Sequence, residues 1–499
     1  MLDHFIKKGK KYGYFKDNHW LESASGEVIP SISPINNEIV GYMQNMTTDE
    51  VDKAIKSSKA AFSSWKSQPM NIRVQILKKA SKIIFENTAL ITALIIKEIA
   101  KPYNEALDEV VRTADLISFY GDEGSRMIGE VLTSDLFPRY SKSKTAIVER
   151  VPLGVILSIP PFNYPFNESA PKLVGAIISG NTVVLKPPSQ GGITTLILGE
   201  IFRLAGLPDG VLNIITGDSA IIGDFAVSHT DIAGINFTGS TKTALHIQKI
   251  LEKENRLLPL LLMGLGGKDA AIVLEDCNIK AAALNIADGA FTYSGQRCTA
   301  IKRVLVEDSI ADSFIEELKS IVLKKYILGN PNDKSINMGP VISDKQAEYI
   351  ESLVNDAISK KSIVICGGQR SGRYIEATIL DHVSLDSKLA WEEPFGPVLP
   401  IIRIKNVDEA IDIANKSEYG LQSSVFTKNI DTAFEVAEKL EVGVVQINGK
   451  DSRGPDNFPF NGVKNSGYGN IQGAKYLIES LTKLKTTVIN KVNESSPNV

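Results

Sequence analysis

Two kinds of hydrophobic pattern follow one another along this chain. Residues 49–130 place apolar side chains at helical spacing, and the first predicted helix opens on Thr and acidic residues, as a helix N-terminus favours. From residue 151 onward, short apolar runs that end in proline or glycine alternate with amphipathic stretches. We predict strands at 154–160, 182–187, 211–217 and 234–240. Strands that alternate with helices predict a parallel, doubly wound sheet.

The same alternation resumes after residue 268. Apolar runs in "DAAIVLED", "KRVLVED", "VLPIIRIKN" and "VGVVQING" predict further strands, and helices are predicted at 279–290 and 309–325. A break near 266–270 therefore separates two α/β units. The segments 138–151 and "KLKTTVINKV" alternate polar and apolar residues. We expect both to be strands outside the two sheets, paired with each other or with another subunit.

Length and composition restrict the possible functions. A chain of 499 residues is expected to form two or three domains. Its net charge of −3 gives no general attraction to nucleic acid or to an anionic membrane, so neither partner is expected. The N-terminus shows no signal peptide, and the longest apolar run, "LLPLLLMGLGG", is too short to cross a bilayer.

The cysteine and histidine content points to a reducing compartment. Three widely spaced cysteines fit neither a disulfide framework nor a CxxC metal site, which favours the cytoplasm. Five histidines without paired ligand spacing predict no metal site.

Polar and glycine-rich segments follow several predicted strands of the first unit, where open parallel sheets bind ligands. Gly239 and Ser240 begin a predicted helix, whose N-terminus suits a pyrophosphate. Lys186 follows a strand and could reach ribose hydroxyls or a phosphate. The GxGxxG fingerprint is absent, so these residues alone leave a dinucleotide site and simple turns equally open. The segment "LLMGLGGKDA" (261–270) is not a P-loop, because Asp269 follows Lys268 where a hydroxyl is needed.

Cys298 is the strongest candidate nucleophile. Arg297 precedes it, and an adjacent cation is expected to lower a thiol pKa and favour the thiolate. Cys277 has two acidic neighbours, which disfavour a thiolate, and Cys366 lies in an apolar run typical of a buried strand. Inert packing remains the alternative for any single cysteine.

Four motifs, "PPFNYP", "GQRCTA", "EEPFGPV" and "NFPFNGVKNSGYG", resemble in this order the aldehyde dehydrogenase superfamily over almost the whole chain. The resemblance implies an α/β fold with two doubly wound parallel-sheet domains and a small β element for oligomerisation, in a homotetramer. The implied ranges are 1–137 and 152–267 for the NAD(P)-binding domain, 268–470 for the catalytic domain, and 138–151 with 471–499 for the oligomerisation element.

The resemblance also implies the chemistry. Cys298 would form a thiohemiacetal with an aldehyde, transfer of a hydride to a nicotinamide cofactor would give a thioester, and water would hydrolyse it. Asn163 and the Cys298 backbone N–H would form the oxyanion hole. The implied cofactor-binding residues are Pro160, Phe162, Lys186, Ser189, Gly217, Phe237, Gly239, Ser240, Leu265, Glu393 and Phe395. Ser189 stands where NAD-preferring relatives often carry a glutamate that would repel a 2′-phosphate, so NADP is favoured and NAD stays open as a second cofactor.

Three arginines and two hydroxyl residues indicate a narrower class of expected substrates. Arg112, Tyr164, Arg297, Thr299 and Arg453 resemble the phosphate-binding residues of non-phosphorylating glyceraldehyde-3-phosphate dehydrogenases. Guanidinium groups bind phosphate oxygens in pairs, and one dianion justifies several of them. The alternatives are surface charges at Arg112 and Arg453, and a semialdehyde or unphosphorylated glyceraldehyde as the substrate.

Gly264 departs from the pattern that the resemblance implies. Family members carry at this position a glutamate that activates the thiol or the deacylating water, and glycine cannot act as a base. We therefore expect slow hydrolysis or a different base, whether this glycine is natural or introduced. A catalytically impaired nucleotide-binding protein is the alternative from another functional class.

Overall fold

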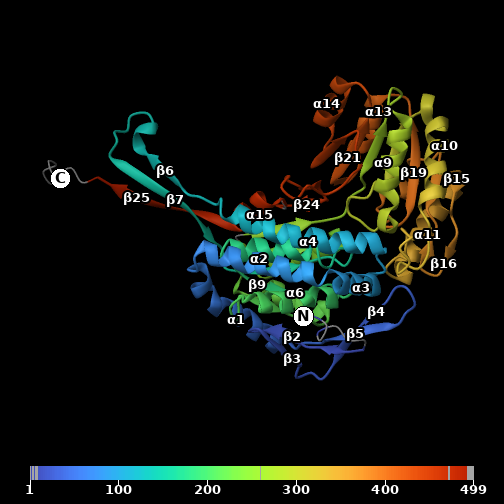
Figure 1. Ribbon diagram of the computed structural model, residues 1–499. Coiled ribbons are helices and arrows are strands. Elements are labelled where there is room, and N and C mark those ends of the chain that lie inside the picture. Colours follow the sequence, from blue (N-terminus) through green and yellow to red (C-terminus); the bar gives the residue numbers. More distant parts are fainter. Residues whose placement is uncertain (1, 3–4, 6–8, 259, 470–471, 492–499) are drawn as a thin grey trace.

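The computed structural model describes residues 2, 5, 9–258, 260–469 and 472–491. It has two lobes and a long projecting arm (Figure 1). The first lobe contains an eight-stranded sheet in the order β24-β12-β11-β8-β9-β10-β2-β3. Its strands are β24 (Gly467–Tyr468), β12 (Leu260–Gly264), β11 (Ile232–Thr238), β8 (Val155–Ile159), β9 (Thr182–Leu185), β10 (Leu212–Ile214), β2 (Tyr14–Lys16) and β3 (His19–Leu21).

The five central strands, β12 to β10, run parallel, and antiparallel strands close both edges. The four strands predicted between residues 154 and 240 are confirmed as β8, β9, β10 and β11. Their side chains are mostly buried because helices cover the sheet, as a continuous apolar run requires of a central parallel strand.

The amphipathic segment 49–130 forms four helices, as its spacing predicts. They are α1 (Thr48–Lys66), α2 (Met70–Glu86), α3 (Thr88–Ile99) and α4 (Tyr103–Gly124). Thr47 and Glu50 form a capping box at the start of α1, which satisfies backbone N–H groups of the first turn. The remaining helices of this lobe are α5 (Ser169–Ile178), α6 (Gly192–Ala205), α7 (Asp224–Ser228), α8 (Thr241–Lys253) and α15 (Ala474–Ser480).

The second lobe contains a seven-stranded sheet in the order β15-β18-β19-β14-β13-β21-β22, parallel except at β15. Its strands are β15 (Ile363–Cys366), β18 (Thr378–Asp381), β19 (Val398–Ile404), β14 (Arg303–Glu307), β13 (Ala270–Val273), β21 (Gln422–Phe426) and β22 (Val444–Ile447). Its helices are α9 (Ile279–Phe291), α10 (Asp308–Lys325), α11 (Asp344–Ser359), α12 (Lys388–Trp391), α13 (Val407–Asn415) and α14 (Ile430–Lys439). The predicted fold of two doubly wound sheets is confirmed, with residues 265–269 joining them.

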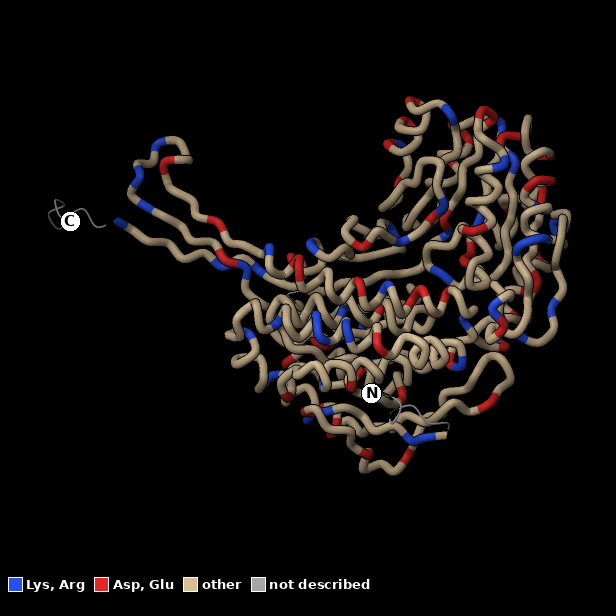
Figure 2. The backbone as a smooth tube through the Cα atoms, in the orientation of Figure 1, with Lys and Arg blue, Asp and Glu red and all other residues tan. Residues whose placement is uncertain are grey.

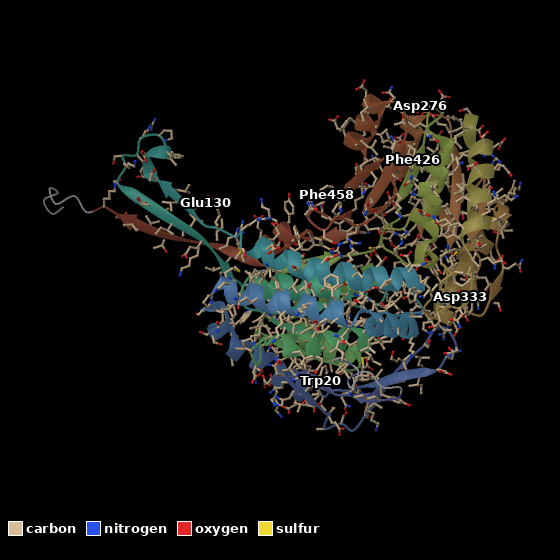
Figure 3. All side chains as sticks on the ribbon, in the orientation of Figure 1. Trp20, Glu130, Asp276, Asp333, Phe426 and Phe458 are labelled. Atoms are coloured by element: carbon tan, nitrogen blue, oxygen red, sulfur yellow. The ribbon has the colours of Figure 1, made fainter. Side chains whose placement is uncertain are left out.

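The projecting arm is an antiparallel sheet of β6 (Glu130–Thr133), β7 (Lys144–Pro152) and β25 (Thr482–Asn490). Figure 3 labels Glu130 on this arm, away from both lobes. The predicted pairing of the two outlying segments is thus confirmed. The arm begins at Glu130, earlier than the predicted residue 138, because β6 pairs with β7. Residues 471 and 492–499 of the predicted oligomerisation element lie outside the described residues.

Two C-terminal segments belong to the first lobe rather than to the predicted ranges. β24, inside the predicted catalytic range, pairs with β12, and α15, inside the predicted oligomerisation range, packs against α4 and α5. A further small sheet, which the sequence pattern does not predict, is formed by β1 (Lys11–Tyr12), β5 (Ile39–Gln44) and β4 (Val28–Ile32). The domain ranges remain otherwise a prediction.

Charged residues of both signs are interspersed over the two lobes (Figure 2). Within the described part of the chain, no helix has the length and apolar character needed to span a membrane.

Candidate active site

A cavity of about 510 Å³ lies where the carboxyl ends of the first sheet's central strands face the loop before β14. Residues from both lobes and from the linker between them contribute to its walls. Thirteen of the predicted site residues line it: Arg112, Phe162, Asn163, Tyr164, Gly239, Ser240, Leu265, Arg297, Cys298, Thr299, Glu393, Phe395 and Arg453. The fold therefore brings most of the predicted catalytic, cofactor and substrate residues to one place.

The loop that carries Cys298 is held from both sides. A tight turn precedes it, in which Tyr293 and Ser294 adopt left-handed backbone angles. Asn163 Nδ2 donates a hydrogen bond to the carbonyl oxygen of Gln296 at 2.9 Å. Lys302 Nζ donates to the carbonyl oxygen of Cys298 at 2.5 Å. Asn163 and Cys298 thus lie close together, as an oxyanion hole built from them would need.

Arg297 does not activate the thiol in the way its neighbouring position predicts. Burial raises the pKa of Cys298 to about 11, and the cation that opposes this shift is Lys302. The Arg297 guanidinium points instead to the backbone carbonyls of Asp288 and Gly289 at the end of α9. The prediction of a thiolate stabilised by Arg297 is therefore wrong, because adjacency in sequence does not bring the two side chains together.

The raised pKa has a measurable consequence. Since only the thiolate alkylates rapidly, the rate of Cys298 labelling by iodoacetamide should rise about tenfold per pH unit from about pH 7 to about pH 10. Peptide mass spectrometry of the cofactor-free protein measures it. Buried Cys277, whose pKa burial also raises to about 11, should stay unlabelled in the native protein and is the internal control. A plateau in Cys298 labelling below about pH 8 would contradict this account.

Glu393 and Phe395 form the wall contributed by the second lobe. Glu393 Oε1 accepts a hydrogen bond from the Gly267 N–H at 3.1 Å and lies 3.1 Å from Lys302 Nζ. A Cβ atom on Gly266 would stand 2.2 Å from Glu393 Oε2, so only glycine allows this approach. The Phe395 ring meets the Phe162 ring edge-to-face, with centroids 5.8 Å apart.

The predicted helix start at Gly239 and Ser240 is confirmed by the turn between β11 and α8. Ser240 is the N-cap of α8 and its hydroxyl accepts from the Thr243 N–H at 3.3 Å. The Gly239 N–H donates to the Gly264 carbonyl at 3.0 Å. Phe237 does not line the cavity, because its ring is buried in the core beneath Gly239.

The remaining predicted cofactor residues lie outside the cavity. Lys186 follows β9, is buried, and donates from Nζ to Ser219 Oγ at 2.8 Å. Burial lowers its pKa to about 8. Ser189 is exposed, Pro160 is buried, and Gly217 has a φ of 152°.

The predicted phosphate-binding arginines already have acidic or backbone partners. Arg112 binds Asp456 with Nε at 2.9 Å and with a terminal nitrogen at 3.1 Å. Arg453 forms an ion pair with Glu168. Arg297 binds the two carbonyls of α9, but its Nε is buried without a hydrogen-bond partner among the described residues. Arg297 therefore lines the cavity with one guanidinium N–H that no described group satisfies.

The two other members of the predicted substrate set are neutral. Tyr164 is beneath Lys101, whose Nζ lies 3.4 Å from the ring centroid, and burial raises the Tyr164 pKa. Thr299 is buried directly after the cysteine.

Several residues of the site were not predicted from the sequence. They are Glu168, which lines the cavity, and Lys172, Lys302 and Asp456, which pair with its lining residues. None of them belongs to the quoted motifs, although Asp456 directly precedes one of them. Glu168, Lys302 and Asp456 each lie within a few residues of a quoted motif, and this proximity is the sign that the sequence offers.

Gly264 ends β12 and is buried beside the cavity. It lies opposite Thr238 of β11 and Gly467 of β24 in the sheet register. The next residues, Leu265 and Gly266, line the cavity. The predicted break near 266–270 is confirmed, since this segment joins the two units, and it also lines the cavity. Among the described residues, no group of three or more His, Cys, Asp or Glu side chains is arranged to hold a metal ion.

The chain is similar to known proteins over almost its whole length. The chain is 47% identical over 479 residues to an NADP-dependent glyceraldehyde-3-phosphate dehydrogenase of Streptococcus equinus, covering 96% of this chain and 98% of that protein. It is 45% identical to the enzyme of the same name from Pisum sativum, over 97% of this chain and 96% of that protein. A crystal structure of the NADP-dependent glyceraldehyde-3-phosphate dehydrogenase from Bacillus halodurans C-125 complexed with NADP has a TM-score of 0.93 and 42% identity, over 97% of this chain and all of that one (100%).

The family model also matches almost the whole length. Residues 20–487 fit the aldehyde dehydrogenase family, and this match includes the second sheet, the five parallel strands of the first sheet and the walls of the cavity. The chain belongs to the aldehyde dehydrogenase family.

Proposed function

We propose that this protein oxidises D-glyceraldehyde 3-phosphate to 3-phosphoglycerate with NADP, without inorganic phosphate. The observation that carries the proposal is the joint presence of Cys298, Asn163 and the cation set Arg112, Arg297 and Arg453 in one cavity. The names of the relatives with 43–47% identity support the same reaction.

The residues present suit a nicotinamide dinucleotide. The first turn of α8, which Ser240 caps, offers N–H groups to a pyrophosphate, and the close approach of Glu393 to Gly266 places a carboxylate for ribose hydroxyls. Lys186 would contact the adenosine ribose or its 2′-phosphate, with no carboxylate at Ser189 to repel that phosphate. When bound, the nicotinamide supplies a hydride acceptor.

The protein's own groups account for the rest of the reaction. The Cys298 sulfur attacks the aldehyde carbon, and the oxygen that becomes negative receives hydrogen bonds from Asn163 and the Cys298 N–H. Loss of one such donor typically costs about 3–4 kcal/mol of transition-state stabilisation. Loss of hydride leaves an acyl group on Cys298 as a thioester, which water then releases as the acid.

The product distinguishes this reaction from its phosphorylating counterpart. We expect the purified protein to form NADPH and 3-phosphoglycerate from glyceraldehyde 3-phosphate and NADP⁺ in phosphate-free buffer. Mass spectrometry identifies the product, and added phosphate should change neither product nor rate. A requirement for phosphate, or formation of an acyl phosphate, would contradict the proposal.

Cofactor choice should depend on pH through Lys186. Burial lowers the pKa of this ammonium to about 8, so in the free protein its charge is complete below that pH and is lost above it. If Lys186 binds the 2′-phosphate, NADP⁺ affinity should fall by up to about tenfold per pH unit above about pH 8. NAD⁺, which lacks this phosphate, should respond much less in the same fluorescence titration. Parallel curves for the two cofactors would show that Lys186 does not select between them.

A second candidate substrate is an aldehyde without a phosphate, either unphosphorylated glyceraldehyde or a semialdehyde. Glu168 and Asp456 already pair with Arg453 and Arg112, and each carboxylate would repel a phosphate dianion. We favour the phosphorylated substrate because Arg297 lines the cavity and its Nε has no hydrogen-bond partner among the described residues.

We also propose a cytoplasmic homotetramer. The arm projects from the body of the protein, and its three strands expose apolar side chains (Figure 1). Val131, Leu132, Leu484, Val488 and Ile489 are each 44–68% exposed, which is unusual for such residues unless another surface covers them. Light scattering would give the mass of the assembly.

A further inference from the structure

Hydrolysis of the acyl group requires a base that the segment 261–270 does not supply. Gly264 ends β12 at the place where the family resemblance expects a glutamate, and a glycine has no group that can take a proton from water. A positioned general base contributes roughly 10²–10⁴-fold to a rate. The identity of the base is a question that rests on the acyl-cysteine chemistry proposed above. Either another side chain acts as the base, or the reaction stops at the thioester.

Two carboxylates line the cavity, Glu168 and Glu393. Glu393 is set aside because the proposed cofactor site assigns its carboxylate to the ribose hydroxyls, and its Oε1 already accepts the Gly267 N–H and lies 3.1 Å from Lys302 Nζ. Asp269 and Asp451 are buried nearby but do not line the cavity, so water in it does not meet them. Glu168 is left as the carboxylate that a water beside Cys298 could contact.

The two oxygens of Glu168 differ in their surroundings. Oε1 is held by the Arg453 guanidinium. Oε2 is buried and has no hydrogen-bond partner among the described residues, and Lys172 Nζ lies 3.9 Å away. A buried carboxylate oxygen without a donor is unfavourable, so an oxygen kept in this state at a cavity wall is suited to accept a proton or a hydrogen bond from a bound molecule.

Lys172 connects this oxygen to the position of the missing glutamate. Its Nζ donates to Thr238 Oγ1 at 2.6 Å and to Asn236 Oδ1 at 3.1 Å. Thr238 pairs with Gly264 in the sheet register. Glu168, Lys172 and Thr238 therefore form a polar path that leads from the start of α5 to the end of β12.

Lys172 itself is a weaker candidate for the base. Burial lowers its pKa to about 7, but its nitrogen is occupied with Asn236 and Thr238, and it does not line the cavity. It can instead hold Glu168 in place and stabilise its charge.

We propose that Glu168 is the general base that hydrolyses the Cys298 thioester in this protein. Oε2 takes a proton from a water whose oxygen attacks the acyl carbon. The carbon–sulfur bond then breaks, the Cys298 sulfur leaves with the electron pair, and the proton held by Glu168 restores the thiol. One water is consumed and one carboxylic acid is formed, with no change in oxidation state.

Rapid mixing with saturating glyceraldehyde 3-phosphate and NADP⁺ tests the proposal. Glu168→Gln should give a burst of about one NADPH per subunit and then a steady rate lowered roughly 10²–10⁴-fold. Mass spectrometry of the quenched protein should find the acyl group on Cys298. Glu123→Gln removes a carboxylate on α4 that pairs with Arg126 and does not line the cavity, and should keep the wild-type steady rate without acyl accumulation.

Restoring a carboxylate at position 264, at the end of β12, gives a second readout. The double variant Gly264→Glu with Glu168→Gln should have a steady rate at least tenfold higher than that of Glu168→Gln alone. A purely structural role of Glu168 would not predict this gain. If Glu168 only positions Arg453, its loss would raise KM without acyl accumulation, and the proposal would be overturned. Wild-type steady turnover in Glu168→Gln would also overturn it, while the proposed function would stand. If the wild-type protein forms no NADPH at all, the proposed function fails instead.

Discussion

Replacing Cys298 with serine is expected to lower NADPH formation from glyceraldehyde 3-phosphate by about 10⁴-fold or more. The serine hydroxyl preserves the size of the side chain but is far less acidic than a thiol and a weaker nucleophile at neutral pH. Asn163 and Lys302 would still hold the loop through the carbonyls of Gln296 and residue 298. The loss should therefore appear in kcat, measured spectrophotometrically at saturating substrate.

NADP⁺ binding provides the control for this variant. The dissociation constant should stay close to the wild-type value, because the proposed adenosine contacts at Lys186 and Ser189 lie outside the cavity. Cys277→Ser, at a buried cysteine remote from the cavity walls, should retain activity. Substantial activity in Cys298→Ser would mean that another nucleophile carries the reaction.

Arg297→Gln is expected to lower kcat/KM for glyceraldehyde 3-phosphate by roughly 10²-fold, which corresponds to about 2.7 kcal/mol. Arg297 lines the cavity, and its Nε has no hydrogen-bond partner among the described residues. The same variant should change kcat/KM for unphosphorylated glyceraldehyde only slightly, because no phosphate contact is lost.

The unphosphorylated substrate also separates phosphate binding from damage to the cysteine loop. Arg297 braces the end of α9 through Asp288 and Gly289, so a general distortion would lower the activity toward both substrates. An equal loss for the two aldehydes would assign Arg297 a structural role. Arg373→Gln, at a surface ion pair with Asp344, is a matched control that should affect neither substrate.

The fold was largely predictable because its strands are buried on both faces. Apolar runs such as 155–159 and 270–273 have no polar side to expose, and a parallel sheet is the arrangement that covers them. The arm was predictable from its alternation, but its start at Glu130 was not, since β6 has mostly exposed residues and only its pairing with β7 defines it. Likewise β24 has two residues, too few to produce a pattern.

The site was predictable where chemistry is concentrated in short motifs. Asn163, Cys298 and Glu393 stand in such motifs and meet in the cavity. The electrostatics were not predictable, since they depend on side-chain direction. Arg297 precedes Cys298 but turns toward α9, whereas Lys302 reaches back across the loop to the Cys298 carbonyl.

Glu168 was not predictable from the sequence for the same reason. In the sequence it is one glutamate among many, between the "PPFNYP" motif and a helix. Its role depends on Arg453 and Lys172, which come from a distant loop and from the next turn of α5. Only the folded chain brings this carboxylate to the cavity in which Gly264 leaves a base missing.

The central claim is that the cavity recognises a phosphorylated aldehyde, and the ratio of two rate constants tests it most directly. With NADP⁺ saturating and no inorganic phosphate, kcat/KM should be measured for D-glyceraldehyde 3-phosphate and for D-glyceraldehyde. We expect the phosphorylated substrate to be favoured by at least about 10²-fold, as charge-assisted hydrogen bonds to a dianion would give. Equal values, or a preference for the unphosphorylated aldehyde, would contradict the assignment of Arg112, Arg297 and Arg453 to a phosphate.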